Sequence, residues 1–164
     1  MSLPRSARRV QEALRRHGLD ADIVQTPDSA RTAPEAALAV GCDVGAIVKS
    51  LVFRGTRTGD PVLVLTSGAN RADEARVTQE IGEPVERADA EYVRARTGFA
   101  IGGVPPLGHD APVRTLIDED LLRHAEVWGA AGTPHAVFGV SPDELVRVTG
   151  GRVVSVAARG PAGG

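Results

Sequence analysis

The chain has few aromatic residues and only one cysteine. Phe, Trp and Tyr make up 3% of its 164 residues, so its core must be built from Val, Leu, Ile and Ala. Cys42 cannot form an internal disulfide, which favours a reducing compartment. No apolar run is long enough for a membrane span, and no apolar segment follows the N-terminal arginines as it would in a signal peptide. We therefore expect a cytoplasmic protein with no membrane partner.

An excess of positive charge is also missing. The net charge is −2, whereas a protein that holds nucleic acid mainly through phosphates should be basic. Any contact with nucleic acid must then use a local patch. An arginine-rich helix is predicted over residues 6–17. Its basic face is either such a patch or an ordinary solvated surface.

Several familiar site motifs are absent. The four histidines, at positions 17, 109, 124 and 135, show no spacing with Cys or carboxylates that is typical of zinc ligands. The chain has no phosphate loop of the Walker type, no dinucleotide fingerprint and no serine nucleophile elbow. Cys42 is interpreted as an inert small hydrophobe, and the alternative is a nucleophile. The sequence therefore predicts no metal and no cofactor.

The alternation of apolar runs and turn residues predicts an α+β fold. A chain of this length forms one domain, which we place at residues 1–158, with a disordered tail at 159–164. We expect a mixed, mostly antiparallel sheet of six or seven strands surrounded by helices. Capping boxes at Thr32–Glu35 and Ser141–Glu144 mark two helix starts. The strands are expected at residues 22–25, 47–53, 62–66, 113–117, 126–132, 136–140 and 153–156.

The predicted strand at 47–53 contains Lys49, the only lysine in the chain. Every other basic residue except histidine is an arginine, which would supply a positive charge equally well on a solvated surface. A lysine in an apolar strand therefore indicates a site that needs a compact ammonium or a neutralisable amine. The alternative is a lysine whose stem lies on the sheet while its head reaches water.

The densest cluster of glycine and proline lies at residues 98–109. Within it, Gly102 and Gly103 allow close approach of a ligand to the backbone, and Pro105 and Pro106 stiffen the loop. Rigid backbone N–H groups suit a carbonyl oxygen that becomes an oxyanion. The alternative is a tight structural bend. Lys49 and this loop would complement each other on two sides of a bound ester.

These two segments resemble the YbaK/prolyl-tRNA synthetase-associated domain family. Residues 47–53 are similar to its lysine strand, and Gly102–Pro106 is similar to its Gly-x-x-x-Pro element. Three further stretches occur in the expected order, and the resemblance covers about residues 6–156. Those stretches are residues 32–37, 67–73 and 141–145.

The resemblance implies a free-standing aminoacyl-tRNA deacylase, a carboxylic ester hydrolase that acts on mischarged tRNA, most often tRNA for proline. Its partners would be that tRNA and prolyl-tRNA synthetase. It implies that Lys49 holds the tRNA 3′ end or the ester, and that the amides of Gly102 and Gly103 orient the carbonyl. A bound water would attack, assisted by the terminal ribose hydroxyl. The substrate-binding residues that it implies are Thr32, Ser50, Ile101, Val104, Pro105, Pro106, Gly132, Thr133 and His135.

The sequence also departs from the family pattern. Ser50 stands where relatives commonly carry Thr or Asn, so the amino acid removed stays open among Ala, Ser, Thr, Cys and small non-protein amino acids. His135 either replaces a basic residue of the family or is a surface histidine. Two other functions remain as alternatives: a non-catalytic module that binds tRNA or a synthetase, and an unrelated enzyme that forms a Schiff base at Lys49.

Overall fold

Helix α1 (Arg5–Arg16) shows how the apolar pattern builds the fold. Ala7, Val10 and Leu14 recur at helical spacing and are fully buried, while Arg5, Arg8, Arg15 and Arg16 are exposed. The structure, a computed structural model, describes residues 3–158. The predicted disordered tail at 159–164 lies outside the described residues.

The remaining elements follow the predicted order, except for one short strand at Val85–Arg87 that was not predicted. Both capping boxes are present, at the starts of α2 and α5. Short 3₁₀ turns, η1 (Val44–Ala46) and η2 (Glu119–Arg123), precede β2 and follow β5. The other elements are β1 (Ile23–Gln25), α2 (Ala33–Val40), β2 (Val48–Gly55), β3 (Pro61–Ser67), α3 (Glu74–Ile81), β4 (Val85–Arg87), α4 (Ala90–Thr97), β5 (Arg114–Asp118), β6 (Val127–Ala130), β7 (Ala136–Val140), α5 (Pro142–Thr149) and β8 (Arg152–Val154).

The α+β prediction is confirmed, but the strands form two sheets. The larger sheet has the order β4-β2-β3-β5-β8, in which β2 is antiparallel to β3 and β4, while β5 is parallel to β3 and β8. The smaller sheet, β1-β7-β6, is antiparallel throughout. A single β-bridge between Ile47 and Trp128 connects the sheets. Apolar patterns predict which residues form strands, but the partner of each strand is set by tertiary packing.

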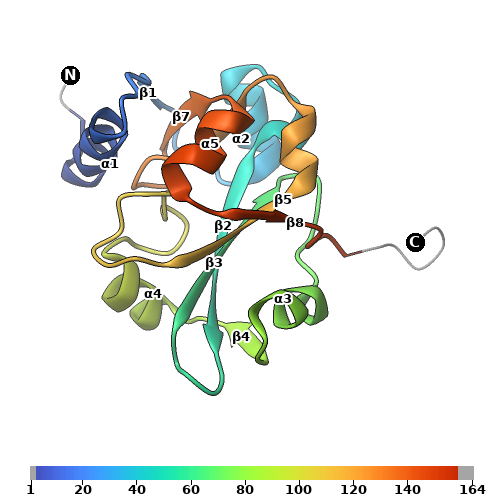
Figure 1. Cartoon of the computed structure of the whole chain (residues 1–164). Coiled ribbons are helices and arrows are strands. Elements are labelled where there is room, and N and C mark those ends of the chain that lie inside the picture. Colours follow the sequence, from blue (N-terminus) through green and yellow to red (C-terminus); the bar gives the residue numbers. More distant parts are fainter. Residues whose placement is uncertain (1–2, 159–164) are drawn as a thin grey trace.

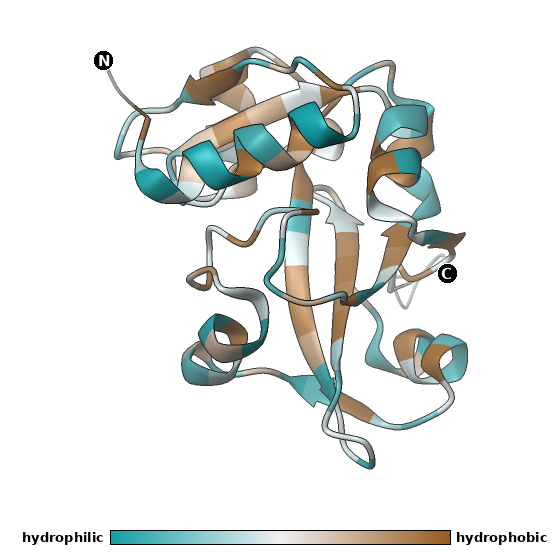
Figure 2. Ribbon diagram, turned by 60° about the vertical axis from the view of Figure 1, so that its left-hand side comes forward, coloured by the Kyte–Doolittle hydropathy of each residue, from teal (hydrophilic) through white to brown (hydrophobic). Residues whose placement is uncertain are grey.

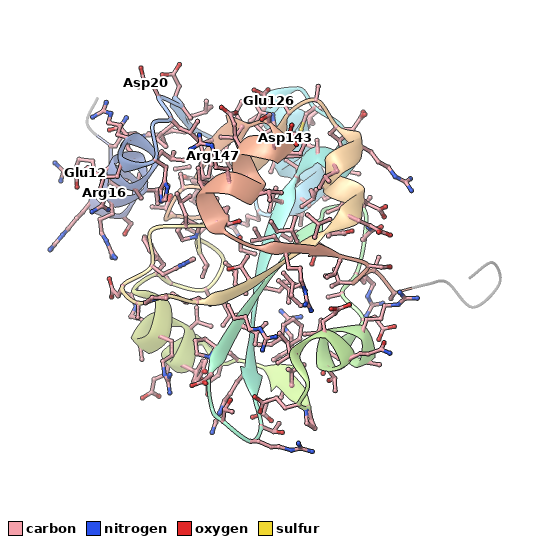
Figure 3. The ribbon with its side chains drawn as sticks, viewed as in Figure 1. Glu12, Arg16, Asp20, Glu126, Asp143 and Arg147 are labelled. Carbon is pink, nitrogen blue, oxygen red and sulfur yellow. The ribbon has the colours of Figure 1, made fainter. Side chains whose placement is uncertain are left out.

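Figure 1 shows how these layers surround the long hairpin of β2 and β3. The smaller sheet, α1, α2 and α5 lie at one end, and α3 and α4 lie on opposite sides of the other end. Helix α5 is fastened to α1, because Arg147 Nη1 donates a hydrogen bond of 2.8 Å to the carbonyl of His17. Figure 3 shows Arg147 on the side of the molecule where α1 and α5 lie.

Two apolar clusters cover the two faces of the larger sheet. On β2, Val48 and Val52 belong to the larger cluster, whereas Leu51 and Phe53 belong to the smaller one. This division follows from the alternation of side chains along a strand. In Figure 2 the hairpin strands are largely hydrophobic, while helix α1 carries many hydrophilic residues. Within residues 3–158, no helix has both the length and the apolar character that a membrane span requires.

Candidate active site

The candidate site lies along an open edge of β2. Strand β4 pairs with β2 only from Phe53 to Gly55, and the bridge to the smaller sheet is at Ile47. Between these points a pocket of about 330 Å³ opens beside the strand. Every residue from Ile47 to Val52 lines the pocket, together with parts of α2, β4, α4, β6 and the loop after α4.

The backbone of Ser50 faces this opening. Residues of an antiparallel strand alternately direct their N–H and C=O groups toward one neighbour and then the other. The carbonyl of Val52 accepts a hydrogen bond of 3.1 Å from the amide of Ala88, so Val52 faces away from β3. Ser50, two residues earlier, faces the same way, toward the open edge. The pocket therefore offers one backbone donor and one backbone acceptor at its centre.

The side chains of Lys49 and Ser50 project to opposite faces of the sheet. Ser50 lies on the face of Val48 and Val52, and its hydroxyl is buried without a hydrogen-bond partner among the described residues. An unpaired buried hydroxyl costs about 1–3 kcal/mol. A ligand that supplied a polar group beside Ser50 would remove that cost.

Lys49 is held by the turn that follows β3. Its Nζ donates a hydrogen bond of 2.6 Å to the backbone carbonyl of Asn70. Burial lowers the pKa of Lys49, as do the positive charges of Arg71 and Arg87, whereas Asp118 raises it. The ammonium is therefore easier to deprotonate than that of an exposed lysine, and its position is fixed by a backbone group.

Asp118 organises that turn from the adjoining strand. This fully buried carboxylate accepts hydrogen bonds from the amides of Ser67 (3.0 Å) and Asp120 (3.0 Å). It also accepts one of 2.9 Å from the Asn70 side chain, which donates another of 2.8 Å to Asp120. The carbonyl that receives the Lys49 ammonium is thus positioned by a buried acid far away in sequence.

The two adjacent glycines of the loop after α4 have different roles. Gly102 lines the pocket with φ at +89°, a conformation that favours glycine, and its amide has no hydrogen-bond partner among residues 3–158. The Gly103 amide instead donates a hydrogen bond of 3.0 Å to Ala100 and lies outside the pocket lining. A Cβ on Gly103 would lie 2.8 Å from Cα of Thr133. Of the two predicted donors, the geometry leaves Gly102 available and gives Gly103 a structural role.

The rest of this loop is braced from outside the pocket. His109 Nε2 lies 2.7 Å from the carbonyl of Pro105, and burial lowers the pKa of His109, so its neutral form donates this bond. Arg9 of α1 donates a hydrogen bond of 3.1 Å to the Gly98 carbonyl and pairs with Asp110. These contacts fix the loop that carries Gly102.

The structure separates the other predicted binding residues into two groups. Thr32, Ile101 and Val104 line the pocket with Ser50, although the Thr32 hydroxyl is also the helix cap of α2. The residues of the second group belong to neighbouring loops and do not line the pocket. That second group is Pro105, Pro106, Gly132, Thr133 and His135.

Two arginines that the sequence did not single out also line the pocket. These are Arg31, just before α2, and Arg87, in β4. Together with Lys49 they are the charged residues of the lining within the described chain, and all three are cationic. Strand β4 was missed because it is short and follows Pro84, so no pattern predicted that Arg87 would face the pocket.

Comparison with known proteins gives consistent matches. Residues 27–148 match the model of the aminoacyl-tRNA editing domain. YwhH of Bacillus subtilis, which is uncharacterised, is 33% identical over 76% of this chain and 78% of its own. EbsC of Enterococcus faecalis, named as a proposed Cys-tRNA(Pro)/Cys-tRNA(Cys) deacylase, is 25% identical over 78% of each chain. Proline–tRNA ligase of Limosilactobacillus fermentum is 32% identical over 56% of this chain and 17% of the ligase.

A solved structure supports the same family as these relatives. A crystal structure described as a proposed trans-editing enzyme for prolyl-tRNA synthetase is 51% identical, with a TM-score of 0.92. The match covers 96% of this chain and all of that one. The family model covers most of the chain, and the folds superpose over nearly their full length. The chain belongs to the YbaK-type family of aminoacyl-tRNA editing domains.

Proposed function

We propose that this protein hydrolyses the ester of a tRNA for proline that carries a small, wrong amino acid. One observation carries the proposal: Lys49 and Gly102, whose amide is unpaired among residues 3–158, line the same small pocket beside an open strand edge. The ammonium suits the charged end of a tRNA, and the amide suits a carbonyl oxygen on which negative charge develops.

The pocket walls favour a small amino acid. Its volume of about 330 Å³ is at the lower end of the range for ligand pockets, about 300–1,000 Å³. Much of the wall is built from alanines and from the valines that flank Ser50. The alanines are Ala30, Ala33, Ala36, Ala88 and Ala130.

An editing role also has a physical reason. A synthetase pocket for proline rejects a smaller amino acid weakly, because one missing methylene is worth only about 1–3 kcal/mol. A second, small site that hydrolyses the wrong ester restores accuracy. The relatives named above as an editing enzyme and a deacylase support this assignment.

The proposed reaction needs few acid–base groups from the protein. A water attacks the ester carbonyl, the bond from the carbonyl carbon to the ribose oxygen breaks, and that oxygen takes a proton. The free amino acid and the tRNA are the products. No Asp, Glu or His is found among the described residues that line the pocket. As the family resemblance implies, we assign assistance in proton transfer to the neighbouring ribose hydroxyl of the tRNA, with Lys49 holding the substrate.

The direct test follows release of a labelled amino acid from tRNA for proline charged with alanine or with proline. Hydrolysis of the alanyl ester with sparing of the prolyl ester supports the proposal. Saturable binding of both charged tRNAs without hydrolysis would instead identify a non-catalytic binding module.

A further inference from the structure

Lys49, Arg71 and Arg87 form a cationic row beside β2, and among residues 3–158 the pocket lining has no acidic member. Arg87 lines the pocket, and Arg71 follows the turn that holds the Lys49 ammonium. Neither guanidinium forms an ion pair within the described part of the chain, although five other arginines do. Elsewhere the surface mixes both signs: Figure 3 shows Asp143 and Arg147 on the same helix, α5.

The sheet places Arg87 on the same face as Lys49. Arg87 pairs directly with Phe53 of β2, and paired residues project to the same face. Phe53 and Lys49 are four positions apart on one strand, so they also share a face. The guanidinium carbon of Arg87 lies 5.6 Å from the centre of the Phe53 ring, which orients this exposed side chain.

The folded chain compensates the positive charge of this row only in part. Lys49, Arg71 and Arg87 repel one another, and the buried Asp118 offsets only part of this charge at Lys49. Within residues 3–158, the pocket lining itself holds no carboxylate. Both arginines act on Lys49 strongly enough to lower its pKa. A ligand that brings negative charge to this row would relieve the repulsion.

We propose that Arg87 and Arg71 bind consecutive backbone phosphates at the single-stranded 3′ end of an RNA, on either side of the nucleotide held by Lys49. This inference rests on the proposed function, because it extends that substrate beyond the ester. Arginine suits the role through its forked donors, which match phosphate oxygens. The aminoacyl group then lies across the strand edge, on the side of Ser50.

The test compares Arg87→Gln and Arg71→Gln with Arg54→Gln. Arg54 is a matched control because it neighbours Phe53 on β2 but projects to the opposite face, where it lies 4.0 Å from Glu86. We expect each of the first two variants to raise KM for charged tRNA about tenfold, as for one lost charge-assisted hydrogen bond, with a much smaller change in kcat. Arg54→Gln should behave as wild type.

The salt dependence of binding separates a lost phosphate contact from a purely structural effect, which would leave the salt slope unchanged. One phosphate contact on a single strand contributes about 0.7 to the slope of log affinity against log salt. The slope for Arg87→Gln should therefore be shallower than that of wild type by about this amount. A 5′-phosphorylated CCA trinucleotide, titrated without any amino acid, should show the same loss of affinity and slope.

The outcomes separate this inference from the proposed function. Hydrolysis that persists in Arg87→Gln with unchanged KM and salt slope overturns the phosphate assignment and leaves the deacylase intact. If wild type shows no hydrolysis but binds the trinucleotide in a way that still depends on Arg87 and Arg71, the proposed deacylase activity is overturned. Phosphate binding by the cationic row is then supported. Trinucleotide binding that is absent in wild type, or equal in all variants, also overturns the phosphate assignment.

Discussion

The ammonium of Lys49 donates a hydrogen bond of 2.6 Å to the backbone carbonyl of Asn70, and this contact fixes the only lysine of the chain at the pocket. Because the acceptor is a carbonyl and not a carboxylate, the ammonium is positioned without forming an ion pair within residues 3–158. An ammonium held in this way is available to an anionic or polarised ligand.

The buried carboxylate behind this contact should be important for stability. Asp118→Ala removes the acceptor of the Ser67 amide and of the Asn70 side chain, and leaving a buried donor unpaired costs about 1–3 kcal/mol. We expect the free energy of unfolding to fall by about 3 kcal/mol, measured by urea denaturation. Asp110→Ala, at an exposed ion pair with Arg9, is the control and should cost less than about 1 kcal/mol. Equal losses in the two variants would contradict the assigned role of Asp118.

The pH dependence of hydrolysis should report the charge of Lys49. Its pKa is lowered by burial, Arg71 and Arg87, so activity that needs the ammonium should decline before the pH of about 10.4 at which an ordinary lysine deprotonates. Arg71→Gln removes a charge that lowers this pKa, so the alkaline limb of kcat should move to higher pH. Asp118→Asn removes a charge that raises it, so the limb should move to lower pH. Enzyme-free ester hydrolysis is subtracted at each pH, and a limb that stays in place in both variants would exclude Lys49 as its origin.

Ser50 is predicted to set preference among small amino acids. Its hydroxyl, which has no partner within residues 3–158, lies in the pocket wall and suits a substrate with a hydroxyl or thiol. Ser50→Ala should reduce kcat/KM for seryl, threonyl or cysteinyl esters by about tenfold relative to the alanyl ester, as for one lost hydrogen bond of about 1.4 kcal/mol. Unchanged relative rates would show that the Ser50 side chain does not contact the amino acid.

Gly102 should matter for activity beyond its backbone strain. Alanine at φ near +90° is disfavoured by about 1–2 kcal/mol. Gly59 has φ at +77°, has open space around it and lies outside the pocket lining, so Gly59→Ala is a matched control. Both variants should lose similar stability in thermal denaturation, but only Gly102→Ala should lower kcat. An equal kcat in the two variants would show that Gly102 does not take part in catalysis.

Part of this site could be predicted from local sequence. Lys49 stands out as a single lysine in an apolar strand, and its antiparallel pairing with β3 follows from two adjacent apolar runs joined by turn residues. The two capping boxes fixed the starts of α2 and α5, because capping is a contact between near neighbours.

The remainder depends on contacts between distant residues. Asn70 meets Asp118 across 48 positions, and Arg87 reaches the pocket only because β4 pairs with the end of β2. The two glycines of the loop look equivalent in sequence. Only the fold shows that the Gly103 amide is used within its own turn, while that of Gly102 has no partner in the part of the chain that the structure describes.

The most direct test of the central claim is a deacylation panel. Transfer RNA for proline, charged in turn with alanine, serine, cysteine, threonine and proline, is incubated with wild type and with Lys49→Ala, whose fold is checked by circular dichroism. We predict selective hydrolysis of a small wrong amino acid by wild type and a loss of at least about a hundredfold in Lys49→Ala, the cost of one strong charge-assisted contact. Equal hydrolysis by the two proteins would contradict the assignment of Lys49, and no turnover of any ester by wild type would contradict the proposed function itself.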